Sequence, residues 1–315
     1  MIKQKTAFLF PGQGSQSVGM GRDLYDSYPE AKAVFDEVDD ILHQNLSTLM
    51  FEGDIKELTQ TQNAQPAIMA VSIALMRVLE ARGFVLKNNA TLVAGHSLGE
   101  YTALCATGAL TLSETATVLR ARGQAMAEAG RIEAGGMLVV LGLADELVRK
   151  IATEADCFVA NDNGAGQWVL SGSLASLTVA KMRAEEMGAK RAIPLPVSGA
   201  FHSPLMKRAQ EKMELILKEL HFQKPNLPLV MNVTAVQEDD PQDLSNLLIR
   251  QIVSPVRWRE SVLYMQSQGI TRFIECGPGV VLSGLVRRIL PDSEQKSVKD
   301  QATLISFLDD FQKNT

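Results

Sequence analysis

Histidine is scarce in this chain of 315 residues, which contains four: His43, His96, His202 and His221. Histidine is the side chain that most often acts as a general base in catalysis. If the protein uses a histidine base, the sequence offers few candidates for it.

Cysteine is almost as scarce. The three cysteines, Cys105, Cys157 and Cys276, are far apart in the chain and odd in number. Such a set forms neither a disulfide framework nor a zinc site. We therefore expect no metal site, and we expect a reduced, cytoplasmic environment.

The sequence also lacks long apolar runs and an excess of basic charge. No run approaches the roughly 18–20 apolar residues that span a bilayer, so we expect no membrane partner. The short apolar run at residues 6–10 ends at Pro11-Gly12 without a small-residue cleavage site, which predicts a strand and not a signal peptide. The 31 basic and 36 acidic residues give a net charge of -5, which argues against nucleic-acid binding.

The pattern of apolar segments predicts one large α/β domain formed by residues 1–128 and 197–315. Strands are expected at 6–10, 91–94, 229–233 and 271–275, and the first two run into glycine-rich turns. Helices are expected from Pro29, over 66–82 with Pro66 at its start, and over 113–130, 204–220, 242–252 and 256–268. The helix at 66–82 is apolar nearly all round, so we expect it to be buried.

Residues 129–196 predict a small inserted domain. The apolar segments there alternate as β-α-β-β-α-β, the ferredoxin-like order. Expected strands lie at 137–143, 158–160, 168–170 and 191–195, and expected helices at 145–154 and 174–187.

Gly95-His96-Ser97-Leu98-Gly99 fits the G-x-S-x-G pattern of a nucleophilic serine. The glycines permit a strained turn between strand and helix, and the helix N-terminus favours a developing oxyanion. The pattern predicts that Ser97 is a nucleophile. The alternative is an ordinary tight turn whose serine caps the helix.

A serine nucleophile needs a base, and His202 is the best candidate by elimination. His96 adjoins the serine on a sharp turn, where neighbouring side chains point apart, and His43 and His221 lie at helix ends. His202 lies in a loop that enters a helix after the insert, a common place for catalytic groups. The alternative is a loop histidine with a structural role.

No acid suits a Ser-His-Asp triad, because the aspartates between Ser97 and His202 fall in the insert without a strand-end context. A backbone carbonyl is expected to orient the imidazole instead. The turn at Gly12-Gln13 can supply an N–H donor to the same oxyanion as Leu98, or it can be a plain turn. Arg120 and Arg122 are two apart on one helix, so they point to different faces. A solvated side chain is the default for either, whereas an inward-facing guanidinium would need a carboxylate partner.

These motifs together resemble the malonyl-CoA:acyl-carrier-protein transacylase family. The matches extend over nearly the whole chain, and their order and spacing make the resemblance specific. They comprise Phe10-Pro11-Gly12-Gln13-Gly14-Ser15-Gln16, Gly95-His96-Ser97-Leu98-Gly99-Glu100-Tyr101, Arg122-Gly123 with Met126, Gly199-Ala200-Phe201-His202-Ser203, Gln251 with Pro255-Val256, and Glu275-Cys276-Gly277-Pro278-Gly279. The resemblance implies an α/β-hydrolase-like domain with a ferredoxin-like insert.

The resemblance also implies roles for the site residues. Ser97 would carry the acyl group, with His202 as base and the Gln13 and Leu98 N–H groups as oxyanion hole. Arg122 would pair with the malonyl carboxylate, and the Gln251 carbonyl would orient His202. Asn161 and Asn163 would lie near the CoA or pantetheine arm. Phe201 belongs to a His-Ala-Phe-His tetrad that accompanies malonyl selection in related polyketide acyltransferases, and Gly199 departs from its first position.

The expected activity is malonyl transfer from malonyl-CoA to the phosphopantetheine thiol of an acyl carrier protein, for fatty-acid or polyketide synthesis. It would proceed through malonyl-serine with ping-pong kinetics and without a cofactor. We expect a monomer that binds the acidic carrier protein transiently. Lys190-Arg191 and Arg287-Arg288 are docking candidates, and the alternative for each pair is an ordinary solvated face. The alternatives are a hydrolase, such as a carboxylesterase or proofreading thioesterase, and a non-catalytic docking module.

Overall fold

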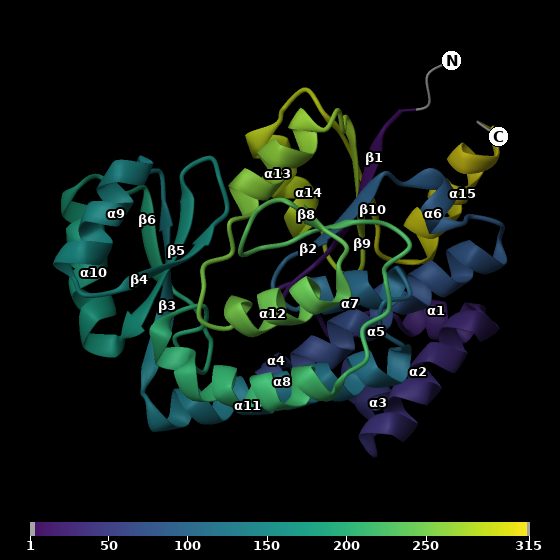
Figure 1. Cartoon of the computed structure of the whole chain (residues 1–315), viewed down its shortest axis with the longest axis horizontal. Helices are drawn as coiled ribbons and strands as arrows, with labels where there is room; N and C mark the ends of the chain where they lie inside the picture. Colours follow the sequence, from purple (N-terminus) through teal and green to yellow (C-terminus); the bar gives the residue numbers. More distant parts are fainter. Residues whose placement is uncertain (1–3, 314–315) are drawn as a thin grey trace.

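The structure is a computed structural model that describes residues 4–313. Its larger sheet is central and has the strand order β10-β9-β1-β2-β7-β8 (Figure 1). Its strands are β1 (Thr6–Phe10), β2 (Leu92–Gly95), β7 (Leu229–Val230), β8 (Gln237–Glu238), β9 (Arg272–Cys276) and β10 (Glu294–Val298). All neighbours in this sheet are parallel except β7 and β8, which pair antiparallel.

The central sheet is buried on both faces, as parallel sheets usually are. Along β1, Phe8 and Phe10 join one apolar core, and Ala7 and Leu9 join another on the opposite face. The first core contains α2 (Pro29–Leu42), α5 (Thr61–Ala81), α7 (Gly99–Ala106) and α8 (Leu112–Ile132). The second contains α13 (Trp258–Ser267) and α14 (Val281–Ile289).

The remaining helices of this part extend and connect these layers. They are α1 (Arg22–Ser27), α3 (Leu46–Glu52), α4 (Ile55–Thr59), α6 (Leu86–Asn89), a 3-10 turn η1 (Pro204–Met206), α11 (Lys207–Glu219), α12 (Pro241–Gln251) and α15 (Gln301–Lys313). The expected helix over 204–220 therefore begins as a 3-10 turn. The polar strand β10 and the helix α15 were not expected from the sequence.

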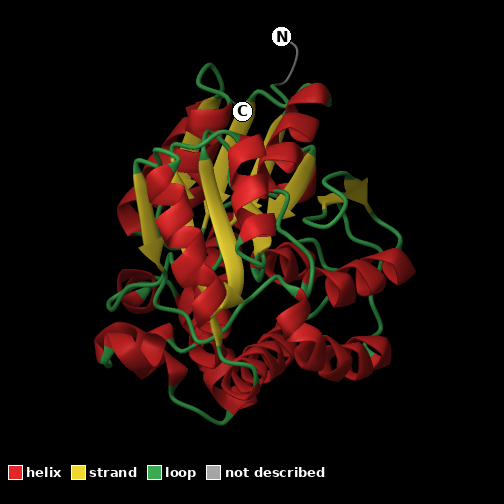
Figure 2. Ribbon diagram, turned by 90° about the vertical axis from the view of Figure 1, so that its left-hand side faces the viewer, coloured by secondary structure: helices red, strands yellow, loops and turns green. Residues whose placement is uncertain are grey.

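The second sheet belongs to the insert, on the left of Figure 1, and has the order β4-β5-β3-β6. It contains β3 (Gly135–Leu141), β4 (Phe158–Asp162), β5 (Gln167–Ser173) and β6 (Arg191–Pro194), all antiparallel. Helices α9 (Asp145–Glu154) and α10 (Leu174–Glu186) lie in front of its strands in Figure 2. The predicted α/β fold class is thus confirmed. The expected boundary at residues 128/129 falls inside α8, which continues to Ile132.

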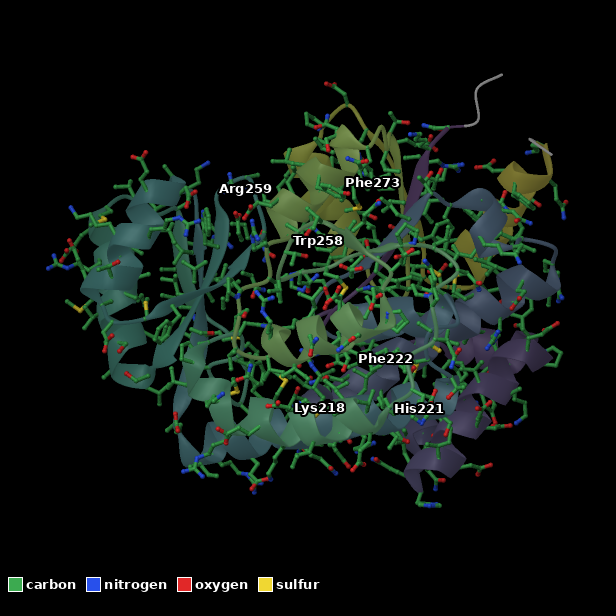
Figure 3. All side chains as sticks on the ribbon, in the orientation of Figure 1. Lys218, His221, Phe222, Trp258, Arg259 and Phe273 are labelled. Carbon is green, nitrogen blue, oxygen red and sulfur yellow. The ribbon has the colours of Figure 1, made fainter. Side chains whose placement is uncertain are left out.

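Hydrogen bonds and ion pairs also attach the insert to the larger domain, at a place away from the two points where the chain passes between them. Val256 bridges to the end of β4: its N–H donates to Ala160 O over 2.8 Å, and its carbonyl accepts from Asp162 N over 3.0 Å. Arg259 reaches from α13 toward the insert (Figure 3) and pairs with Asp162 at 2.8 Å and with Asp145 at 3.4 Å. These contacts fix the β4–β5 turn beside the carboxyl ends of the central strands.

Helix α5 corrects two expectations. It begins at Thr61, so Pro66 lies inside it and not at its start. By length and composition it is also apolar enough to cross a membrane, contrary to the expectation that no apolar run in the chain is long enough. In the structure 83% of that apolar stretch is buried within the fold, as expected of a helix that is apolar all round.

Candidate active site

The serine turn is as sharp as its glycines predict. Strand β2 ends at Gly95, helix α7 begins at Gly99, and Ser97 between them has a φ of 54°. A Cβ on Gly95 would lie 1.9 Å from the Gly99 carbonyl carbon, and one on Gly99 would lie 2.2 Å from the Phe10 carbonyl oxygen. Only glycine fits either position, so this local sequence produces a strained turn that presents the serine hydroxyl.

The serine hydroxyl contacts the predicted base. Ser97 Oγ lies 2.8 Å from His202 Nε2, and His202 Nδ1 lies 2.9 Å from the Gln251 carbonyl oxygen. A carbonyl oxygen only accepts, so Nδ1 carries the proton and Nε2 is left as the base. Burial, assisted by the charge of Arg122, lowers the pKa of His202 to about 3. The neutral imidazole is therefore the stable form.

The loop that carries His202 is held on both sides. His202 itself has a φ of 57°, and Ser203 Oγ donates to the Ala200 carbonyl over 2.6 Å. From the insert, Ser171 Oγ donates to the Phe201 carbonyl over 2.6 Å. The imidazole is thus placed by both domains.

The other histidines lie away from the serine hydroxyl. His96 Nε2 donates to Asn163 Oδ1 over 3.1 Å, and the His96 ring lies beside Trp258. His43 ends α2 and His221 follows α11, and both are exposed. Of the four histidines, His202 is the one whose ring lies within hydrogen-bond distance of Ser97 Oγ.

The two candidate oxyanion donors lie next to each other because β1 and β2 are paired, with Phe10 opposite Gly95. The turns after these strands contain Gln13 and Leu98. The Ser97 N–H is already used, since it donates to Asn232 Oδ1 over 2.8 Å. Within residues 4–313, the Gln13 and Leu98 N–H groups meet no backbone acceptor.

Arg122 lies in the interior, 1% exposed, on a helix that begins at a capping box formed by Thr111 and Glu114. Its guanidinium donates to Gln65 Oε1 over 2.7 Å, to Gln251 Oε1 over 2.8 Å and to Ser97 Oγ over 3.0 Å. No ion pair joins it to an acidic side chain in the described part of the chain. Arg122 is therefore a buried cation beside the nucleophile, held by neutral amides. Burial lowers its pKa.

Arg120 points elsewhere, as the spacing of the two arginines predicts. Its guanidinium donates to Asn63 Oδ1 over 2.8 Å and to Gln44. It is thus a neighbour of Arg122 on the same helix without contact to the serine.

A pocket of about 170 Å³ opens over the serine. Its lining includes the candidate residues Gln13, Ser97, Leu98, Arg122, Asn161, Phe201 and His202. Gln251 reaches the site through its contacts with His202 and Arg122, and Asn163 through His96. Asn161 lines this pocket, and its Oδ1 is buried without a hydrogen-bond partner within residues 4–313.

Sequence reasoning missed three residues that hold the site together: Gln65, Glu100 and Asn232. Gln65 binds Arg122, and the Asn232 amide binds Ser97 N and Gly95 O. Glu100 is 0% exposed and accepts hydrogen bonds from Asn232 and Gln251. Burial raises the pKa of Glu100 to about 8, against these hydrogen bonds and the charge of Arg122. The one local sign of such a role in the sequence was the position of the Glu100 carboxyl group within the apolar stretch of α7.

Comparisons with known proteins identify the family of the chain. A family model described as an acyl transferase domain matches residues 7–313. The chain is 44% identical over 305 residues to the malonyl CoA-acyl carrier protein transacylase of Bacillus subtilis, covering 95% of each chain. It is 36% identical over 307 residues to the Escherichia coli K12 protein of the same name, covering 96% of this chain and 98% of that one.

Solved structures are similar over nearly the whole chain. The acyl-carrier-protein S-malonyltransferase of Bartonella henselae has a TM-score of 0.95 and 42% identity, over 98% of this chain and 100% of that one. A malonyl-transacylase solved in complex with a holo acyl-carrier protein of a type II polyketide synthase has a TM-score of 0.94 and 36% identity, over 98% and 100%.

Proposed function

The chain belongs to the acyl transferase domain family, and from this we infer that it moves malonyl groups from malonyl-CoA to an acyl carrier protein for fatty-acid or polyketide synthesis. It is an enzyme, an S-malonyltransferase acting on the phosphopantetheine thiol of the carrier. The feature of the site that best supports this function is Ser97 Oγ, which lies within hydrogen-bond distance of both a histidine base and a buried arginine.

In the first half-reaction His202 Nε2 takes the proton of Ser97 Oγ as the oxygen attacks the malonyl thioester carbon. The N–H groups of Gln13 and Leu98 stabilise the resulting oxyanion, and each such donor contributes on the order of 3 kcal/mol. The carbon–sulfur bond then breaks. His202 returns its proton to the sulfur, CoA leaves as the thiol, and malonyl stays on Ser97 as an ester.

The second half-reaction reverses these steps with a different thiol. His202 takes the proton of the phosphopantetheine thiol, whose sulfur attacks the ester carbon. The bond between that carbon and Ser97 Oγ breaks, and the serine recovers its proton. Two thiols use one serine in turn, so the kinetics are ping-pong. No step requires a metal, nucleotide or redox cofactor.

Arg122 binds the malonyl carboxylate in this proposal. A guanidinium surrounded by amide oxygens has no anionic partner until the substrate arrives, and a carboxylate then forms a charge-assisted pair with it. The same contact holds the ester in place and away from water. A hydrolase would gain nothing from this arrangement, so the arginine argues against a carboxylesterase or proofreading thioesterase.

The insert side of the pocket receives the thiol arm. Asn161 offers an unpaired amide oxygen, which suits an amide N–H of the pantetheine chain. Asn163 acts through His96, which it fixes at the pocket wall. Phe201 lines the pocket next to His202 and limits the size of the acyl group that fits.

Two exposed basic pairs flank the β4–β5 turn and suit an acidic carrier protein. Ile289, just after Arg287-Arg288, packs against Gly164 on one side of that turn. Lys190, next to Arg191, packs against Gly142, which hydrogen-bonds Gly166 at the turn's other end. None of the four basic side chains has an ion pair among the described residues, so their charge is available. We propose that the carrier protein docks on these pairs.

Mass spectrometry after brief exposure to malonyl-CoA tests the covalent step. The wild-type chain should gain one malonyl group, about 86 Da, at Ser97, and a Ser97→Ala variant should gain none. A wild-type chain that forms no adduct would support the alternative of a non-catalytic docking module.

Adding the carrier protein to the malonylated enzyme then separates transfer from hydrolysis. We expect malonyl carrier protein to accumulate, whereas a hydrolase would release free malonate.

We also propose that the chain acts as a monomer in the cytoplasm, without membrane or nucleic-acid partners. Its three cysteines are free and buried, which suits a reducing compartment, and sedimentation at working concentration would test the monomer.

A further inference from the structure

Glu100 is a fully buried carboxyl group that the proposed chemistry does not use. It lies in the first turn of α7, three residues after Ser97, and each of its oxygens accepts a hydrogen bond. Oε1 accepts from the backbone N–H of Asn232, and Oε2 accepts from the side-chain amide of Gln251. It forms no ion pair within residues 4–313.

We propose that Glu100 is a positioning residue that orients the Gln251 amide and, through it, holds Arg122 ready for the carboxylate of the acyl group. It would thereby determine selectivity for acyl groups that carry a free carboxylate. This inference rests on the function proposed above and assigns a selectivity role to a residue that touches no reacting atom.

The Gln251 amide can face only one way. Its Nε2 donates to Glu100 Oε2 and, over 3.0 Å, to the Ser97 carbonyl, a group that can only accept. Its Oε1 is therefore left to accept from Arg122 over 2.8 Å. A flipped amide would place its oxygen against the Ser97 carbonyl oxygen, which only accepts, and its NH₂ group against a guanidinium, which only donates.

This arrangement orients Arg122 without neutralising it. A carboxylate in direct contact would pair with the guanidinium and compete with the substrate. Glu100 instead contacts Gln251, and the amide oxygens of Gln251 and Gln65 hold the guanidinium from two sides. The Arg122 guanidinium is thus held in one orientation without an acidic partner, so a substrate carboxylate can pair with it.

The second oxygen of Glu100 supports a different part of the site. It binds the Asn232 N–H, and the Asn232 side chain holds both sides of the serine turn, donating to Gly95 O over 2.7 Å and accepting from Ser97 N. This branch supports the nucleophile for any acyl group. The Gln251 branch ends on Arg122 and should therefore affect acyl groups that carry a carboxylate more than those that do not, so the two branches predict different kinetics.

The test is Glu100→Gln, which keeps the size of the side chain and replaces one acceptor oxygen with a donor. The new amide oxygen can still accept from Asn232 N, and its NH₂ group then opposes that of Gln251. We expect the ratio of kcat/KM for malonyl-CoA to that for acetyl-CoA to fall about tenfold, mainly through a higher KM for malonyl-CoA. Glu100→Asp keeps the carboxyl group and should recover part of the ratio.

Asn232→Ala serves as the matched comparison, because it weakens the serine turn and should lower both activities by the same factor. If Glu100→Gln also lowers both equally, or leaves the ratio unchanged, the proposal is overturned. Where Glu100→Gln does not fold, the ratio in Glu100→Asp decides, and an unchanged ratio again overturns it. A wild-type chain that forms no malonyl-serine would instead overturn the proposed function, so the two failures are distinguishable.

Discussion

Replacing Arg122 with alanine tests the assignment of the acyl-group receptor. The change removes a buried cation and leaves the amide oxygens of Gln65 and Gln251 without their donor. It leaves Ser97, His202 and their 2.8 Å contact in place. We therefore expect an enzyme that can still acylate its serine but no longer prefers a malonyl group.

The size of the effect follows from the burial of Arg122. The side chain is 1% exposed, so a substrate carboxylate bound to it is shielded from water. Removing one partner of a buried ion pair costs about 3 kcal/mol or more. This corresponds to a loss of about a hundredfold or more in kcat/KM for malonyl-CoA. Acetyl-CoA has no carboxylate to lose and should be accepted better, because its methyl group no longer lies against an unpaired charge.

The assay measures initial rates of transfer to the carrier protein with malonyl-CoA and acetyl-CoA under matched conditions. Arg120→Ala is the control, since Arg120 is on the same helix and contacts Asn63 and Gln44 instead of the serine. It should leave the ratio of the two rates unchanged. If Arg122→Ala retained its preference for malonyl, the assigned role of Arg122 would be wrong.

Three other predictions concern pH, docking and the serine turn. Burial lowers the pKa of His202 to about 3, so kcat/KM should show no acid limb near 6.5, where an ordinary histidine titrates. Between about pH 3 and about pH 6.5 the unfolded chain binds one more proton than the folded chain, because His202 is protonated in the unfolded chain and neutral in the folded one. The free energy of unfolding should therefore fall below about pH 6.5, and in urea titrations it should fall less in His202→Gln. Reversing the charge of Arg287 and Arg288 should raise KM for the carrier protein but not for malonyl-CoA, and equal increases would contradict docking there. Gly99→Ala should unfold the chain or sharply lower its Tm, because the new Cβ meets the Phe10 carbonyl oxygen at 2.2 Å. Gly284→Ala is the control and should be tolerated, because a Cβ on Gly284 has nothing within 4 Å. A folded, active Gly99→Ala variant would refute the packing argument.

Features that depend on neighbouring residues could be predicted from the sequence. The serine turn needs only two glycines between a buried strand and a helix, and Gly95 and Gly99 are required because backbone atoms occupy the space of their Cβ atoms. The alternation of apolar segments likewise predicted the insert. His202 could be selected as the candidate base because so few histidines had to be considered, and its Nε2 lies 2.8 Å from Ser97 Oγ.

Features that depend on distant segments could not be predicted. The spacing of Arg120 and Arg122 shows that they diverge, but only packing of α8 decides that Arg122 is the buried one. Asn232 is a single amide after a two-residue strand, 135 positions from the serine N–H that it binds. Its sequence surroundings contain nothing that marks it as a partner of the site.

Some element ends also depend on tertiary context. Helix α5 continues five residues before Pro66 because its first turns are buried against the rest of the fold. Strand β10 is largely polar, and most of its residues are only partly buried at the sheet edge, so its sequence shows no apolar alternation.

The left-handed backbone of the serine and the histidine also bears on the evolution of stability in this fold. Ser97 and His202 adopt φ values of 54° and 57°, a left-handed backbone conformation that is uncommon for residues other than glycine. Glycine at either position would relieve strain on the order of 1 kcal/mol or more while it abolished the reaction. Stability alone would thus favour glycine at both positions, whereas the proposed reaction requires the serine and the histidine.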